Sequence, residues 1–287
     1  MGKRFNYTVS ATLGDNKTVF TKFNNPEKNL SNHYEGKVLG EIWGYRVDGL
    51  FASDEEAAEY TSKINQDAVN ERILTDKVDP YYRAGDLKFR DLDGDNVISK
   101  GDDTAYDAGD REIIGNETPR YMYSFRLGAD WNGFDLGIFF QGVGKRDWYP
   151  NYLSTGFWGP YSRAFTSFIP ENFMDQCWSE ENRDGYFPRF RGYQTFAGSQ
   201  LGVNNDRYLQ DASYIRLKNL TVGYTLPVLK KVFTKLRVYF TGENLWYWSP
   251  MLKHTKYIDP EAAGGNGNTG MAYNYSRNFS VGVDITF

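Results

Sequence analysis

Residues 277–287, RNFSVGVDITF, alternate apolar side chains with small or polar ones. Successive side chains of a strand point to opposite faces, so this period of two predicts a β-strand. One face would carry Phe279, Val281, Val283, Ile285 and Phe287, and the other Ser280, Gly282, Asp284 and Thr286. The run approaches the ~9–11 residues that a tilted membrane-crossing strand needs. A small or polar second face is typical of a barrel lumen.

The same alternation recurs along the chain and predicts about six spanning strands. The further runs are 5–13, 121–131, 134–140, 211–226 and 236–242. Asn132-Gly133, between two runs, predicts a tight hairpin, because both turn residues need a positive φ. In 211–226 the phase slips near Lys218-Asn219, which predicts a β-bulge. A soluble β-sandwich also alternates, but soluble strands average ~5–6 residues, so the run length favours a transmembrane β-barrel.

Composition agrees with an all-β protein and excludes several other classes. The 287 residues are 17% aromatic and carry a net charge of −4, so no basic surface indicates nucleic acid. No apolar run approaches the ~18 residues of a transmembrane helix. The single cysteine, Cys177, makes no internal disulfide, and the two histidines leave little material for a histidine-based metal or catalytic site. We expect that the protein is not an enzyme.

The connections between the runs are very unequal. Asn132-Gly133 and 227–235 are short, whereas 14–120, 142–210 and 245–276 are long. Bacterial outer-membrane barrels have short periplasmic turns and long outer loops. With Phe287 at the periplasmic rim, the three long segments are expected to be extracellular loops, and residues 1–287 a C-terminal barrel segment. Within the loops, Ser53 with Glu56 predicts a capped helix, and Pro170 predicts the start of a second one.

The sharpest chemical motif is residues 91–102, DLDGDNVISKGD. Oxygen-bearing groups at loop positions 1, 3, 5, 7, 9 and 12 match an EF-type calcium loop. Asn96 replaces the usual glycine at position 6, and an aspartate replaces the usual glutamate at position 12. An acidic solvated turn is the alternative. We expect structural Ca²⁺ held by Asp91, Asp93, Asp95, the Val97 carbonyl, Ser99 and Asp102.

The loop 142–196 is rich in aromatic side chains. Exposed aromatic faces would stack on sugars, but long loops also need small cores of their own. Packing is favoured over ligand binding. The candidates for substrate binding are Trp148, Tyr149, Tyr152, Trp158 and Tyr161.

Several segments resemble SusC/RagA-type TonB-linked outer-membrane transporters. They are GDLKFRDLDGD (85–95), IIGNETP (113–119), DASYIRLKNLTVGYTLP (211–227), GENL (242–245), YIDPE (257–261) and VDITF (283–287). They occur in order over nearly the whole chain and match about the last third of such a transporter. We expect a fragment or a truncated gene product, since the signal peptide, TonB box and plug domain have no counterpart here.

The resemblance implies a plugged barrel of roughly 22 strands in the cell outer membrane. It also implies a SusD-like lipoprotein partner, contact with outer-membrane lipid, and TonB-powered import of glycans or peptides, with TonB acting through the N-terminal part. A soluble, calcium-stabilised carbohydrate-binding β-domain at the cell surface is the alternative function.

Overall fold

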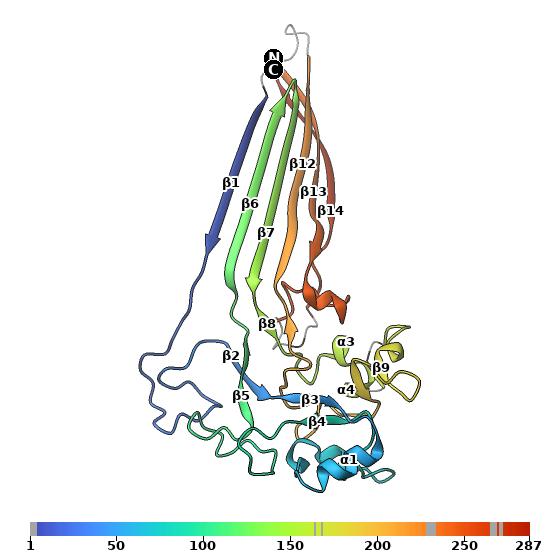
Figure 1. Cartoon of the computed structure of the whole chain (residues 1–287). Coiled ribbons are helices and arrows are strands. Elements are labelled where there is room, and N and C mark those ends of the chain that lie inside the picture. The colour runs from blue at the N-terminus through green and yellow to red at the C-terminus, as the bar shows by residue number, and fades with distance from the viewer. Residues whose placement is uncertain (1–4, 164, 168, 228–233, 265–268, 270–271) are drawn as a thin grey trace.

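The computed structural model describes residues 5–163, 165–167, 169–227, 234–264, 269 and 272–287. Its main element is an antiparallel sheet in the order β1-β6-β7-β12-β13-β14 (Figure 1). The strands are β1 (Asn6–Gly14), β6 (Arg120–Trp131), β7 (Phe134–Lys145), β12 (Tyr214–Leu226), β13 (Lys235–Trp248) and β14 (Asn278–Thr286). These are the six long strands that the alternation predicts. Among the described residues, no helix has the length and apolar character to cross a membrane.

The strand register collects the apolar side chains on one face of the sheet. Paired residues of antiparallel neighbours share a face. One apolar row crosses all six strands through Tyr7, Ala129, Leu136, Val222, Phe240 and Val281. The adjacent row on the other face is Thr8, Gly128, Gly137, Thr221, Thr241 and Ser280. The faces therefore divide as the sequence predicts.

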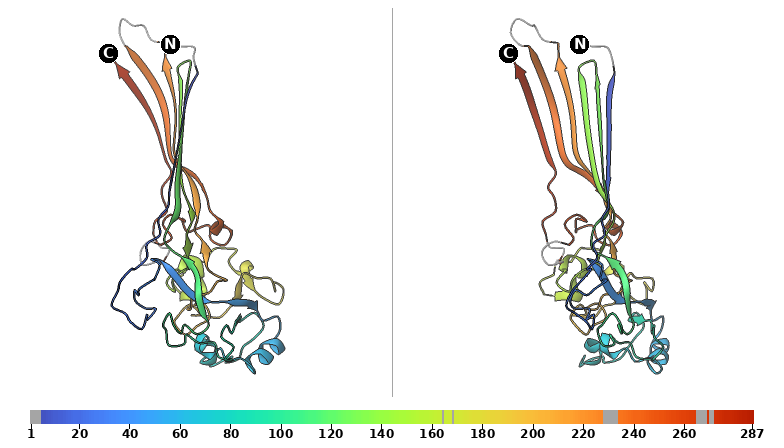
Figure 2. Two further views of the ribbon diagram at one scale, coloured as in Figure 1. Left: turned by 60° about the vertical axis from the view of Figure 1, so that its left-hand side comes forward. Right: turned by 90° about the vertical axis from the view of Figure 1, so that its left-hand side faces the viewer.

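The apolar face is not covered by protein in the part of the chain that the structure describes. Phe279 is 65% exposed and Val281 77% exposed, and Val283 and Ile285 are exposed as well. The six strands form one open sheet, with β1 and β14 as its edges (Figure 2). A second sheet packed on this face, as in a sandwich, is absent from the described residues.

Both local irregularities that the sequence predicts are present. Asn132 has a φ of 48° and Gly133 a φ of 92° in the β6–β7 turn. The register of β12 shifts between Leu217 and Asn219 against both of its neighbours. The second short turn falls largely on residues 228–233, which lie outside the described part.

The two ends of the sheet differ. The start of β1, the C-terminus and the β6–β7 turn lie at one end, and the other end continues into loops, short helices and two-stranded sheets (Figure 1). We call residues 15–119, 146–213 and 249–277 the loop module. Its strands are β2 (Glu41–Tyr45), β3 (Val47–Leu50), β4 (Leu87–Phe89), β5 (Arg111–Asn116), β8 (Asp147–Trp148), β9 (Cys177–Trp178), β10 (Phe187–Arg189) and β11 (Gln210–Asp211). Its helices are α1 (Asp54–Thr61), α2 (Glu71–Leu74), α3 (Thr155–Trp158) and α4 (Pro160–Arg163), with 3₁₀ turns at Asp67–Val69, Met174–Gln176 and Pro250–Lys253.

The hydrophobic core lies in the loop module and not on the sheet. Phe187 is at its centre, with ring centroids 5.0 to 6.3 Å from those of Phe157, Trp158, Tyr161, Phe173, Tyr186 and Tyr208. Aromatic pairs at such distances contribute beyond their buried area. The loop module therefore has the apolar interior that the sheet lacks.

One of the two predicted helices forms. Ser53 Oγ accepts a hydrogen bond from the Glu56 amide at 3.1 Å, which is the N-cap half of a capping box. The Glu56 carboxylate accepts from the amide of Ala52, the residue before the N-cap, at 2.7 Å. The prediction of a helix that starts at Pro170 is wrong. That segment makes a single 3₁₀ turn and then enters β9, because Cys177 is buried in the core and pairs with Phe187.

A buried charge cluster fastens the loop module to the sheet. Arg216 of β12 is 1% exposed and forms an ion pair with Asp259, which is also 1% exposed. Its Nε lies 3.1 Å from a carboxylate oxygen of Glu261, and Lys218 Nζ lies 2.8 Å from the same oxygen. The Tyr247 ring centroid is 4.7 Å from the guanidinium carbon. The segment after β13 is thereby held against the sheet.

Replacing Arg216 with Met is expected to lower the free energy of unfolding by about 3–5 kcal/mol, because Asp259 stays buried without its partner. Denaturant unfolding in detergent micelles measures the loss. Arg183→Met is the matched control, since Arg183 and Glu180 form an exposed pair, and such pairs contribute ~0–1 kcal/mol. Equal small losses in both variants would contradict the role of the cluster.

The loop module is expected to become less stable at low pH, because His254 binds a proton more readily in the unfolded chain than in the folded one. This ring stacks on Tyr186 at 3.6 Å, and burial, with Lys253 and Arg207 nearby, lowers the pKa of His254 to about 4. The unfolded chain takes up the proton near pH ~6.5, so stability is lost as pH falls from there toward 4. Thermal melting against pH measures the loss, and His254→Phe, which keeps the stack, should flatten the curve in this range. An unchanged pH dependence in the variant would argue against His254.

Candidate functional sites in the loop module

The predicted calcium loop is anchored on the core. Ile98 is fully buried, and its amide donates to the Asn65 carbonyl at 2.7 Å, while the Asn65 amide donates to the Asn96 carbonyl at 2.8 Å. Asn96 takes a left-handed φ of 66°, the conformation that position 6 requires and that asparagine tolerates. The loop is therefore held at its middle, and its first residues curl around the Asp91 carboxylate, which accepts hydrogen bonds from the amides of Gly94 at 2.7 Å and Asn96 at 3.0 Å.

Three carboxylates meet at this point. Asp91, Asp93 and Asp110 each place a carboxylate oxygen within 4.8 Å of the others. Asp95 lies outside the group, and its carboxylate accepts a hydrogen bond from the Val97 amide at 2.7 Å. Asp102, expected at position 12, also lies outside it. Ser99 Oγ accepts a hydrogen bond from the Gly101 amide at 3.1 Å. Two of the expected carboxylates thus meet, and a third comes from elsewhere.

Asp110 is the group that sequence reasoning missed. It is fully buried and accepts hydrogen bonds from the amides of Leu92 at 2.7 Å and Ser99 at 2.8 Å. Burial raises the pKa of Asp110 despite these two amides, and the Asp93 and Asp91 carboxylates raise it further. It lies beyond the twelve-residue motif, directly before β5, so the spacing rule for EF-type loops does not find it.

Four of the five aromatic candidates for substrate binding are buried, which agrees with the packing interpretation that the sequence favoured. Trp148 is 1% exposed and Tyr149 6% exposed, and Trp158 and Tyr161 are fully buried. Their rings have no free face for a sugar, because they fill the core of the loop module. Tyr152 remains 44% exposed and packs against Phe196.

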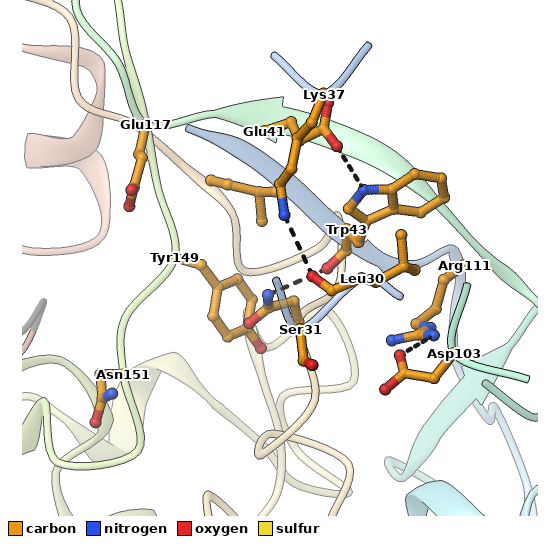
Figure 3. Close-up of a pocket in the computed structure, with 12 residues that line it drawn as sticks. Leu30, Ser31, Lys37, Glu41, Trp43, Asp103, Arg111, Glu117, Tyr149 and Asn151 are labelled. Atoms are coloured by element: carbon orange, nitrogen blue, oxygen red, sulfur yellow. Dashed lines mark hydrogen bonds and ion pairs between the residues drawn. The ribbon is translucent and has the colours of Figure 1, made fainter. Parts of the chain in front are cut away.

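The loop module contains a cavity of about 460 Å³, which we call the loop cavity (Figure 3). Its walls come from segments far apart in sequence, and most of the side chains are polar or charged. They are Leu30, Ser31, Lys37, Glu41, Ile42, Trp43, Asp103, Arg111, Glu117, Tyr149, Asn151 and Asn204. No sequence motif signals this cavity, because the fold alone brings its walls together.

Comparison with known proteins supports the resemblance seen in the motifs. The chain is 30% identical over 269 residues to TonB-dependent receptor P3 of Formosa agariphila, which covers 88% of this chain and 22% of the receptor. It is 28% identical over 216 residues to TonB-dependent receptor P26 of the same organism, covering 71% of the chain and 20% of the receptor. The chain is a relative of the TonB-dependent receptors. It spans about a fifth of the length of these relatives. No family model matches it.

Solved structures show the same fold. The whole chain superimposes on 28% of a chain of the RagAB peptide transporter, with a TM-score of 0.59 and 20% sequence identity. It matches the RagAB peptide importer in the closed-closed state equally well, with a TM-score of 0.59 and 21% identity. The predicted resemblance to SusC/RagA-type TonB-linked transporters is confirmed. The chain is thus a mostly β segment with the fold of part of a TonB-dependent transporter.

Proposed function

We propose that this chain is a C-terminal barrel segment of an outer-membrane importer that works in the manner of SusC. Its six strands would form one part of the barrel wall, and the loop module would be the extracellular part that meets ligand and a SusD-like lipoprotein. TonB would supply the energy through a part of the transporter outside this chain. The relatives are named receptors and transporters, so we propose no catalytic role.

The observation that carries the proposal is the exposed apolar face of the six-stranded sheet. A row of apolar side chains runs across every strand, and members of β14 are more than half exposed. Exposing so much contiguous apolar surface to water is unfavourable, whereas lipid tails cover it at no such cost. The polar row on the other face suits a wet or plugged interior.

The alternative, a soluble calcium-stabilised carbohydrate-binding domain, requires this face to be covered. It also requires exposed aromatic rings for sugar, and four of the five candidate rings are buried. Both requirements count against it.

Val281→Arg is expected to destabilise the folded protein in lipid vesicles by about 2–4 kcal/mol, because it places a charge in the hydrocarbon layer. Ser280→Arg, the neighbouring residue on the polar face, is the matched control and is expected to change the free energy of unfolding far less. Denaturant unfolding from vesicles measures both. Equal effects, or a folded and water-soluble protein without detergent, would refute the membrane assignment.

We further propose that a bound Ca²⁺ ion stabilises the loop module by joining carboxylates of the segment 91–110. Ca²⁺ prefers six to eight oxygen ligands, and the support is the meeting of the Asp91, Asp93 and Asp110 carboxylates within 4.8 Å. A bound divalent cation would also offset the repulsion among three neighbouring carboxylates. In this proposal Asp110 takes the place expected for Asp102.

Calcium at one hundred times its dissociation constant is expected to stabilise the protein by ~2.7 kcal/mol. Asp91→Asn and Asp110→Asn should abolish this gain, and Asp102→Asn should keep it. Thermal melting with calcium and with a chelator measures the difference. Identical melting curves in the two conditions would remove the calcium proposal, and loss of the gain in Asp102→Asn would restore the twelve-residue ligand set.

A further inference from the structure

Two glycines lie opposite each other in the middle of the six-stranded sheet, on its polar face. Gly128 of β6 pairs with Gly137 of β7, and the same row continues through Thr8 on one side and Thr221 on the other. Neither glycine has a positive φ, so the backbone conformation does not require them. A glycine inside a strand weakens the strand, and it often marks a place where another backbone approaches closely.

The described chain does not itself need the space that this glycine pair leaves. A Cβ on Gly128 would lie 3.6 Å from the nearest atom outside the adjoining residues, and one on Gly137 would lie 4.0 Å from it. Both are ordinary van der Waals distances. Several other glycines of the sheet differ from this pair, because a Cβ on them would collide with a neighbouring side chain. They are Gly142, Gly223, Gly242 and Gly282.

The glycine pair lines a hollow of about 350 Å³, which we call the strand hollow. Residues two apart in a strand share a face, so its lining on the polar face comes from β1, β6, β7 and β12, which lie side by side (Figure 1). This lining includes Thr8, Arg126, Gly128, Gly137, Phe139 and Thr221. Small side chains thus form the middle of the hollow, and a larger charged one and an aromatic one stand beside them.

Arg126 gives the strand hollow a positive charge. Its guanidinium carbon lies 5.4 Å from the centroid of the Phe139 ring, and its direct neighbours across the sheet are Ser10 and Phe139. Among the described residues Arg126 forms no ion pair, whereas Arg120 and Arg237 on the same face each pair with an aspartate. The strand hollow therefore combines room for a backbone with an open site for a carboxylate.

We propose that the strand hollow holds an extended segment of the same transporter, from the part of the polypeptide outside residues 1–287. The backbone of this segment packs on Gly128 and Gly137, and one of its acidic side chains pairs with Arg126. The inference rests on the proposed import function and deepens it by naming the surface through which the sheet holds this segment.

Two observations favour this occupant. The match to TonB-dependent receptor P3 covers 22% of that receptor, so most of such a polypeptide lies outside the matched part. The open charge of Arg126 calls for an acidic partner. Water alone would not account for the glycine pair, because water molecules fit around a side chain of any size.

Photo-cross-linking of the complete, detergent-solubilised transporter without added ligand tests the contact. With p-benzoylphenylalanine at Thr221, we expect a cross-link to a peptide of the same polypeptide outside residues 1–287, identified by mass spectrometry. Val222, the next residue and on the apolar face, is the matched control position and should give no such cross-link. The proposal is overturned if Thr221 gives no such cross-link, if it reaches only a separate protein, or if both positions give the same result.

Hydrogen exchange of the cross-linked segment tests the two groups that hold it. Gly137→Leu fills the strand hollow and Arg126→Gln removes its charge, and each should make the amides of that segment exchange about tenfold faster, because the segment opens more often. Arg126→Lys keeps the charge and should keep most of the protection. Gly192→Leu, at an exposed loop glycine with nothing within 4 Å of its Cβ position, is the matched control and should change nothing.

Unchanged exchange in both Gly137→Leu and Arg126→Gln would refute the contact. Equally faster exchange in β6 and β7 would also refute it, because the substitution would then act on the sheet. Arg126→Gln leaves the strand backbone and its glycines in place, which keeps the test decisive if Gly137→Leu fails to fold. Failure here with the membrane test on Val281 upheld would remove only the docked segment, whereas failure of that membrane test would remove the importer itself.

Discussion

The structure of this chain depends on a six-stranded sheet that has one apolar and one polar face and no hydrophobic core of its own. Six strands pair in one antiparallel sheet, and its apolar face is not covered by a second layer in the described part of the chain. Buried apolar side chains of the sheet, Val143 and Tyr214, lie at the ends of β7 and β12 next to the loop module. In water such a sheet would aggregate or collapse. In hydrocarbon the same surface carries no penalty, and the backbone bonds that link neighbouring strands satisfy the polar groups between them. The open edges at β1 and β14 leave further backbone groups that additional strands would satisfy.

The loop module needs stabilising contacts of its own, because its segments lie beyond one end of the sheet. These contacts come from an aromatic core around Phe187 and from buried charge pairs. Asp86 and Arg191 join two distant segments through oxygen–nitrogen distances of 3.0 and 3.1 Å, and Arg216 ties a third segment to β12. The burial of Trp148, Tyr149, Trp158 and Tyr161 follows from this need. A long loop that must keep a fixed shape in water uses its large apolar side chains inside.

Sequence reasoning succeeded where the signal is local and periodic. The strands, the Asn132-Gly133 turn, the bulge after Leu217 and the capped start of α1 each depend on neighbours within a few residues. It failed where distant segments decide the outcome. The stretch after Pro170 has helical spacing, but Cys177 pairs with Phe187 across the core. Asp110 joins Asp91 because β5 begins beside the loop, and no spacing rule reports that approach.

The loop cavity shows what sequence patterns do not report, because segments far apart in the chain form its walls. Lys37 and Glu117 are ordinary charged residues in the sequence, and each has an unremarkable solvated interpretation. The fold pairs the neighbouring charges of the cavity, Arg111 with Asp103 and Glu41 with Trp43 and Val38. Among the described residues that line the cavity, this pairing leaves Lys37 and Glu117 over. A change of one loop residue that supplies Lys37 with a carboxylate would change the charge of this cavity without altering any strand of the six-stranded sheet.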